Sequence, residues 1–124
     1  MRDHEIAIRD FNRAIELEPT SPDAYIFRGV SLISQGQPKV AIRDFKRAEE
    51  LGSENPLIYN GMGRCYRALG RFDDALYSLS EAVEHDPESV DFLVDRSSLY
   101  CDMVAYPSAL NDLTRALNIR PNEP

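Results

Sequence analysis

The fold is decided by the stretch Ala41-Ile42-Arg43-Asp44-Phe45-Lys46-Arg47-Ala48, because its landmark residues recur every 34 residues along the chain. The first alanine recurs at positions 7, 75 and 109, and the last alanine at positions 14, 82 and 116. The phenylalanine recurs as Phe11, Leu79 and Leu113. A self-similarity at this period is typical of a stacked helical array, in which each unit buries its apolar face against its neighbours. Such arrays present extended surfaces to other proteins and rarely catalyse reactions.

The composition indicates a soluble, acidic chain. Its 124 residues are 43% hydrophobic, carry a formal net charge of −7 and include two cysteines, Cys65 and Cys101. A negative chain repels a phosphate backbone, so we expect no nucleic-acid partner. The first residues lack the apolar stretch of a signal peptide, and no run is long enough to span a membrane. We therefore expect an intracellular, cytoplasmic protein with no membrane partner, and we favour two thiols over a disulfide.

Helical patterns alternate with short turns, and no segment shows the alternation of a strand. Glycines at positions 36 and 70 suit left-handed helix ends, and Pro121 is expected to stop the last helix. The helices that open a unit, here called helix A, are predicted over residues 22–34, 56–69 and 90–103. The helices that close a unit, helix B, are predicted over residues 3–17, 38–51, 72–85 and 107–119.

These helices predict an all-α helical-repeat solenoid with three full units, at residues 22–55, 56–89 and 90–123. Residues 1–21 match helix B alone, so they are expected to be the second half of a truncated unit. Repeat arrays need polar caps at their ends, and neither end of this chain has one. We therefore expect a fragment or short isoform of a longer array, able to associate with itself through its uncapped ends.

The repeated pattern resembles the tetratricopeptide repeat along essentially the whole chain. The resemblance rests on one pattern that recurs: Tyr25-x-x-Arg28-Gly29-x-x-Leu32 with Ala41-x3-Phe45, Tyr59-x-x-Met62-Gly63-x-x-Tyr66 with Ala75-x3-Leu79 and Pro87, and Leu93-x-x-Arg96-Ser97-x-x-Tyr100 with Ala109-x3-Leu113 and Pro121. The resemblance implies a right-handed superhelix of antiparallel helix pairs. It also implies that helix A residues line a concave groove that binds peptides or protein segments.

The chain departs from the family pattern at several positions. Val104 replaces a helix-ending glycine, so we expect a strained or reshaped turn there, and Ser53 replaces a proline. Arginine replaces a leucine at two positions, and each arginine is followed 16 residues later by an aspartate. The middle unit has neutral residues at both positions, which suggests an ion pair inside the outer units; chance remains the alternative. The pairs are Arg28 with Asp44 and Arg96 with Asp112, the neutral residues are Met62 and Ser78, and Asp10 holds the aspartate position of the half unit.

The resemblance places the groove on one stripe of each helix A. The stripes run from apolar through basic to acidic, so the expected ligand segment has an apolar anchor, then an acidic residue, then a basic one. Two alternatives stay open: the apolar stripe contacts a missing neighbouring helix, or the arginines pair with the aspartates of the adjacent helix. The predicted groove residues are Ile26, Phe27, Val30 and Ile33, then Asn60, Arg64 and Arg67, then Asp91, Asp95 and Asp102.

The sequence also argues against several other functions. The lysine, asparagine and arginine set with which some members of the family grip the tails of the Hsp70 and Hsp90 chaperones is absent from these units. Gly61-Met62-Gly63 lies inside a predicted helix, so it is not a phosphate loop. The two histidines lie in different units with no zinc-like neighbours, and no carboxylate pair is singled out as acid and base. We therefore predict no catalytic residues, cofactor or metal.

The sequence thus predicts a non-catalytic scaffold or adaptor that binds an unidentified protein or peptide in its groove. The alternative is a structural block whose uncapped ends stack with further repeats or with a second copy.

Overall fold

The computed structural model describes residues 2–119, apart from the side chain of Arg2. Pro121 and the end of the predicted last unit lie outside these residues. The described residues form seven helices and no strand, and every helix end lies within one residue of its prediction. The helices are α1 (Arg2–Leu17), α2 (Pro22–Ser34), α3 (Pro38–Glu50), α4 (Leu57–Ala68), α5 (Phe72–His85), α6 (Val90–Asp102) and α7 (Tyr106–Ile119).

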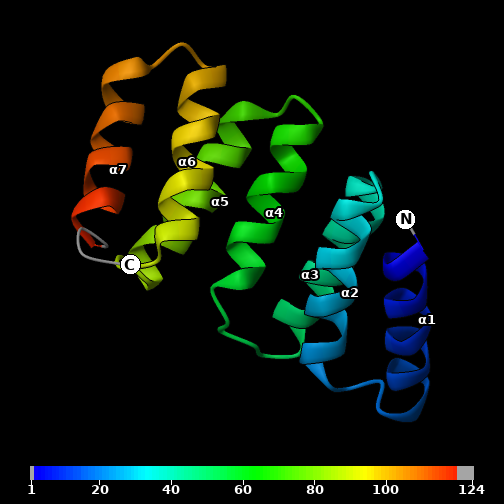
Figure 1. Cartoon of the computed structure of the whole chain (residues 1–124). Helices are drawn as coiled ribbons and strands as arrows, with labels where there is room; N and C mark the ends of the chain where they lie inside the picture. Colours follow the sequence, from blue (N-terminus) through cyan, green and yellow to red (C-terminus); the bar gives the residue numbers. More distant parts are fainter. Residues whose placement is uncertain (1, 120–124) are drawn as a thin grey trace.

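The helices stack in chain order into an elongated array (Figure 1). Each helix packs against the helices before and after it, and α4 also contacts α2 and α6. Within residues 2–119, no Cα atom of α3 lies within 8 Å of one in α1 or α5, and none of α5 lies that close to α7. The array therefore has a continuous layer of helix A and a more open layer of helix B. This arrangement is the predicted all-α helical-repeat solenoid.

The turn after each helix A has the same geometry. Gly36, Gly70 and Val104 have φ angles of 75°, 76° and 60°, in the left-handed region. In all three turns the next amide bonds back to the carbonyl five residues earlier, as from Ala105 to Tyr100 at 2.8 Å. Glycine adopts this conformation without cost, whereas a β-branched residue is strained by about 1–3 kcal/mol. The predicted strain at Val104 is confirmed.

Close approach of the helices depends on glycines that face one buried ring. Phe45 of α3 is fully buried, and its tip lies between Gly29 of α2 and Gly61 of α4. A β-carbon at Gly29 would lie 2.8 Å from the Cζ atom of Phe45, and one at Gly61 would lie 2.2 Å from it. Each distance is shorter than carbon atoms tolerate, so α3 can approach both helices only because they carry no side chain there.

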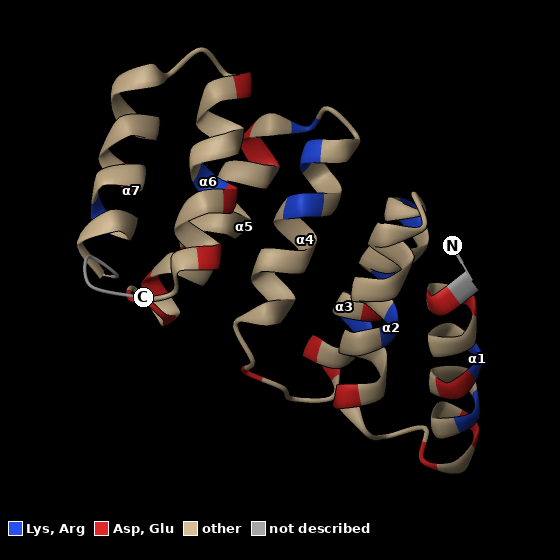
Figure 2. Cartoon of the chain, in the orientation of Figure 1, with Lys and Arg blue, Asp and Glu red and all other residues tan. Residues whose placement is uncertain are grey.

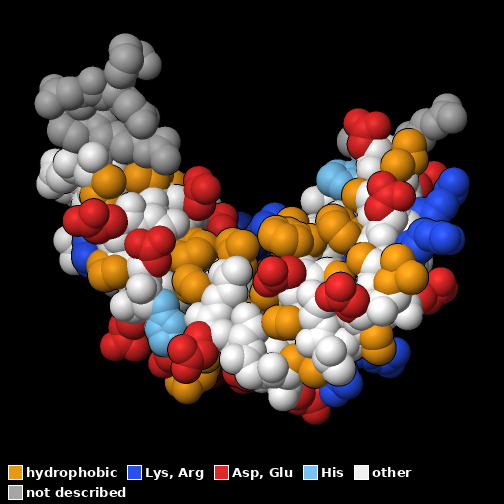
Figure 3. All heavy atoms as spheres, turned by 90° about the horizontal axis from the view of Figure 1, so that it is seen from below, with side chains coloured by type: hydrophobic (Ala, Val, Ile, Leu, Met, Phe, Trp, Pro, Cys, Tyr) orange, Lys and Arg blue, Asp and Glu red, His pale blue; other side chains and the backbone are white. Residues whose placement is uncertain are grey.

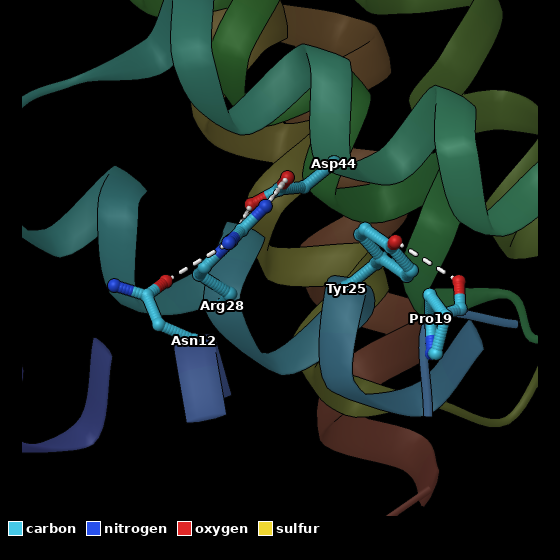
Figure 4. Close-up of polar contacts among 5 residues, drawn as sticks. All are labelled: Asn12, Pro19, Tyr25, Arg28 and Asp44. Atoms are coloured by element: carbon cyan, nitrogen blue, oxygen red, sulfur yellow. Dashed lines mark hydrogen bonds and ion pairs between the residues drawn. The ribbon is translucent and has the colours of Figure 1, made fainter. Parts of the chain in front are cut away.

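The predicted ion pairs inside the outer units are present. Arg28 donates from Nε and Nη2 to the two carboxylate oxygens of Asp44 at 2.8 and 2.6 Å (Figure 4). Arg96 makes the same two bonds to Asp112 at 2.8 and 2.7 Å. These hydrogen bonds raise the pKa of both arginines above its ordinary value. Each pair joins helix A to helix B of its own unit, and both aspartates are buried.

Candidate functional site

Two adjoining pockets form a groove along the layer of helix A. The first, of about 350 Å³, lies between α2, α4 and α6, and the second, of about 420 Å³, continues from it toward the start of α5. They share Arg64 and Asp95 as lining residues, so they form one channel. The space-filling view shows this side of the molecule hollowed, with hydrophobic side chains along the floor (Figure 3).

Most of the predicted groove residues lie together in this channel. Three helices supply them at helical spacing, since residues three, four or seven apart share one face of a helix. Whether they contact a partner remains a prediction. The predicted residues that line the channel are Val30 and Ile33 of α2, Asn60, Arg64 and Arg67 of α4, and Asp91, Asp95 and Asp102 of α6.

Two predicted groove residues lie elsewhere. Ile26 has none of its surface exposed and belongs to the core cluster around Phe45, so it cannot contact a ligand. Phe27 is 45% exposed, but its ring stacks on Phe11 of α1, with centroids 6.1 Å apart. The prediction was wrong for Ile26 because the buried face of α2 is wide enough to include this residue, which the sequence had assigned to the exposed stripe.

The basic residues of α4 and the acidic residues of α6 partly neutralise each other in the groove. Figure 2 shows basic residues in the C-terminal half of α4 beside acidic residues of α6. Arg67 donates from Nη2 to Asp102 at 3.3 Å and makes a second, shorter bond from Nε. This bonding lowers the pKa of Asp102 and raises that of Arg67. Asn60 donates to Asp95 at 3.0 Å.

Arg64 differs from Arg67 because its guanidinium has no carboxylate within ion-pair distance among the described residues. It lines both pockets and is half-buried. The alternative of internal pairing therefore holds for Arg67 and not for Arg64. The groove presents one unpaired cation, within the part of the chain that the structure describes, next to apolar side chains of α2, α4 and α6.

Among the channel residues absent from the predicted set, Gly61 and Phe92 of the first pocket are the most informative. Gly61 lies in the interior of α4, where a glycine costs about 1 kcal/mol relative to alanine. That cost was the available signal, because a glycine kept inside a helix in spite of it can have a packing reason. Phe92 is buried, although it also lines the pocket. No pattern in the sequence separates it from other core residues.

The side chains that could carry chemistry do not converge. Cys65 is fully buried, and burial raises the pKa of its thiol to about 12, whereas Cys101 is exposed. Within residues 2–119, no three His, Cys, Asp or Glu side chains are grouped so as to hold a metal ion. None of the described helices is both long enough and apolar enough to cross a bilayer.

The comparisons with known proteins agree with this geometry. A family model described as tetratricopeptide repeat matches residues 1–56, 28–90 and 60–124. A thermophilic tetratricopeptide repeat protein of Thermus thermophilus is 20% identical, with a TM-score of 0.86 over 95% of this chain and 66% of that chain. MamA of Desulfovibrio magneticus RS-1 is 17% identical, with a TM-score of 0.84 over 98% of this chain and 68% of that chain.

A third similar structure is the APC/C hetero-tetramer Cut9–Hcn1, with 21% identity and a TM-score of 0.83 over 91% of this chain and 23% of that chain. No curated protein matches the sequence. At such low identities the solved structures establish a common fold and nothing more specific.

Proposed function

The chain belongs to the tetratricopeptide repeat family, and from that premise we propose that it is a non-catalytic scaffold or adaptor. Its groove, between α2, α4 and α6, binds an extended or helical segment of another protein. One of the similar structures is a complex of two proteins, Cut9 and Hcn1, which supports protein binding as a use of this fold.

The observation that carries the proposal is the unpaired guanidinium of Arg64 beside an apolar floor. Val30, Leu57 and Val94 line the same pocket as Arg64, and Val94 is 40% exposed. A segment with an apolar side chain would bury it on this floor, at about 25 cal/mol for each Å² removed from water. An acidic side chain next to that anchor would pair with Arg64 in a partly desolvated site.

The pairing inside the groove sharpens the ligand that the sequence predicted. Arg67 and Asp102 already satisfy each other, so they contribute less to a ligand than two free charges would. Asp91 is exposed at the other end of the first pocket and is free to accept a basic residue. The segment that fits best has one acidic residue at its centre, flanked by an apolar anchor and a basic residue.

Arg64→Glu is the sharpest test, because reversing this charge breaks no internal ion pair among the described residues. We expect the variant to lose its specific partners in an affinity capture from lysate, read by mass spectrometry. A matched control is Arg43→Glu on α3, an exposed arginine outside the groove. Circular dichroism checks that both variants fold. Partners that remain with Arg64→Glu, or that are lost equally with Arg43→Glu, would contradict binding in the groove.

A second candidate function is assembly through α7, which one specific comparison within the chain favours. Leu113 and Leu117 are 39% and 72% exposed, whereas Leu79 and Val83, 34 residues earlier on α5, are 1% and 5% exposed because α6 covers them. Leu110, which is 66% exposed, lies one turn before Leu113 on the same helix. If this face joins two copies, Leu110→Glu/Leu117→Glu should convert a concentration-dependent oligomer into a monomer in sedimentation velocity. A wild-type chain that stays monomeric at high concentration would contradict assembly.

A further inference from the structure

A third pocket lies on the side of α4 away from the groove. It has a volume of about 320 Å³ and is lined by residues of α3, α4 and α5, none of which lines the groove. It opens where the backbones of α3 and α5 do not approach each other closely, so α4 forms its floor. Tyr59, Met62 and Tyr66 supply that floor, and their spacing puts them on one face of the helix.

The outer units fill the equivalent place with their own arginine. In the first full unit the guanidinium of Arg28 is held by Asp44 and lies 5.7 Å from the ring centroid of Tyr25 (Figure 4). In the last unit the guanidinium of Arg96 is held by Asp112 and lies 5.7 Å from the ring of Tyr100. A cation within about 6 Å of an aromatic face is attracted to it.

The middle unit keeps the aromatic rings but has no arginine at the position of Arg28 and Arg96. The residue 34 positions after Arg28 and 34 before Arg96 is Met62, and the residue at the corresponding aspartate position is Ser78. The same step relates Tyr59 to Tyr25 and Tyr66 to Tyr100, so this unit has both rings, whereas each outer unit has one of them. A third ring, that of Tyr77, lines the opposite wall of the pocket from α5.

The charges around the pocket favour a cation. Glu49 and Glu81 line it and make no ion pair within residues 2–119. The pKa of Tyr59 is raised, first by burial and then by these two carboxylates, as expected where the local potential is negative. Asp74 also lines the pocket but is paired with Arg71 at 2.6 Å, and the guanidinium of Arg71 lies 4.9 Å from the ring of Tyr66.

Ser78 adds a polar group to the pocket wall. It is only 5% exposed, yet its hydroxyl takes part in none of the side-chain hydrogen bonds found among the described residues. No fully enclosed polar side-chain atom of these residues lacks a partner, so this hydroxyl faces the open space of the pocket. Lys46, at the position equivalent to Asn12 and Ser80, is exposed and does not line the pocket.

We propose that the pocket formed by Tyr59, Tyr66, Tyr77, Glu49, Glu81 and Ser78 binds the guanidinium group of an arginine side chain from a partner protein. The partner's guanidinium takes the place that Arg28 and Arg96 fill in the outer units, beside Tyr59 and Tyr77, while Arg71 remains over the ring of Tyr66. This site is separate from the groove and makes the chain able to contact a partner on two sides.

The test uses N-acetylarginine methylamide as the probe and the tyrosine ring signals of the isotope-labelled chain in NMR as the readout. We expect saturable shifts in the signals of Tyr59, Tyr66 and Tyr77, with a dissociation constant on the order of millimolar for a single side chain. The citrulline analogue, which has the same shape and no charge, should cause no shift. The lysine analogue should bind more weakly, because an ammonium group is more strongly hydrated than a guanidinium.

Two variants change the pocket, and a third changes the groove as a control. Met62→Arg/Ser78→Asp copies the pair of the outer units into the middle unit, so its own guanidinium should fill the pocket and abolish probe binding. Glu49→Gln/Glu81→Gln should weaken binding at least fivefold and changes only side chains at the pocket edge. Arg64→Glu, in the groove, should leave probe binding unchanged.

The proposal would be overturned by an absence of ring shifts in the wild-type chain, or by equal shifts with the citrulline or lysine analogue. Unchanged binding by a folded Met62→Arg/Ser78→Asp variant would also overturn it. Because the probe experiment does not involve the groove, its failure would leave the adaptor function intact. Loss of groove binding would likewise leave this site intact.

Discussion

Gly61→Ala tests the close packing of α3 against α4, because the sign of its effect on the free energy of unfolding depends on that contact. A glycine inside a helix usually costs about 1 kcal/mol relative to alanine, so at a spacious position the substitution would stabilise the chain by that amount. At Gly61 the new β-carbon would lie 2.2 Å from Cζ of Phe45 and 2.6 Å from both Cε atoms. Overpacking of a well-filled core costs about 1–3 kcal/mol.

The ring of Phe45 cannot move aside easily, because Gly29 faces the same tip and the side chain is fully buried. We therefore place the overlap at the upper end of that range. Subtracting the helix gain leaves a net loss of about 2 kcal/mol in the free energy of unfolding, measured by urea denaturation. A variant about 1 kcal/mol more stable than wild type would refute the close contact.

Phe45→Leu supplies the control, because leucine lacks the ring tip that meets Gly61 and already occupies the equivalent position as Leu79. Alone it should cost about 1 kcal/mol. Combined with Gly61→Ala it should recover stability, with a coupling energy of at least about 1 kcal/mol in a double-mutant cycle. Losses that simply add within about 0.5 kcal/mol would show that the two residues do not compete for space.

Three further predictions concern single side chains. Val104→Gly should stabilise the chain by about 1 kcal/mol in urea denaturation, because it removes left-handed strain at a position that is 67% exposed; a loss of stability would contradict this. Ellman's reagent at mildly alkaline pH should titrate Cys101 in the native chain and Cys65 only after unfolding, since burial raises the pKa of Cys65 to about 12. Arg67 lowers the pKa of Asp102 below its ordinary 3.8, so this carboxylate stabilises the fold above that pH and the effect is lost as pH falls through the lowered pKa. Asp102→Asn should therefore be slightly less stable than wild type at neutral pH, and the two should converge in acid; a difference that persists in acid would have another cause.

The 34-residue step was sufficient to predict the architecture, because each landmark residue has the same packing role in every unit. The same step exposed the Arg28–Asp44 and Arg96–Asp112 pairs, since a charge that appears and disappears together with its partner is visible without coordinates. It also predicted the strained turn at Val104.

The candidate site was less predictable, because burial and pairing depend on several helices together. The spacing of Ile26, Val30 and Ile33 indicated one exposed stripe, but the core of the first full unit covers Ile26. Similarly, the sequence could not decide which arginine is paired: Arg67 reaches Asp102, whereas Arg64 reaches none of the carboxylates of α6. The pocket behind α4 depends on the separation of α3 and α5, which no local pattern reports.

The separation of α3 and α5 also bears on the mechanics of the array. Among the described residues the backbones of neighbouring outer-layer helices do not approach each other closely, so these helices are joined mainly through the helices of the inner layer. In such an array each unit contacts only its neighbours, so we expect small changes of angle at successive interfaces to add along the axis. We therefore expect the curvature of the array to change at low energetic cost, and we expect a side chain inserted between α3 and α5 to restrict that change.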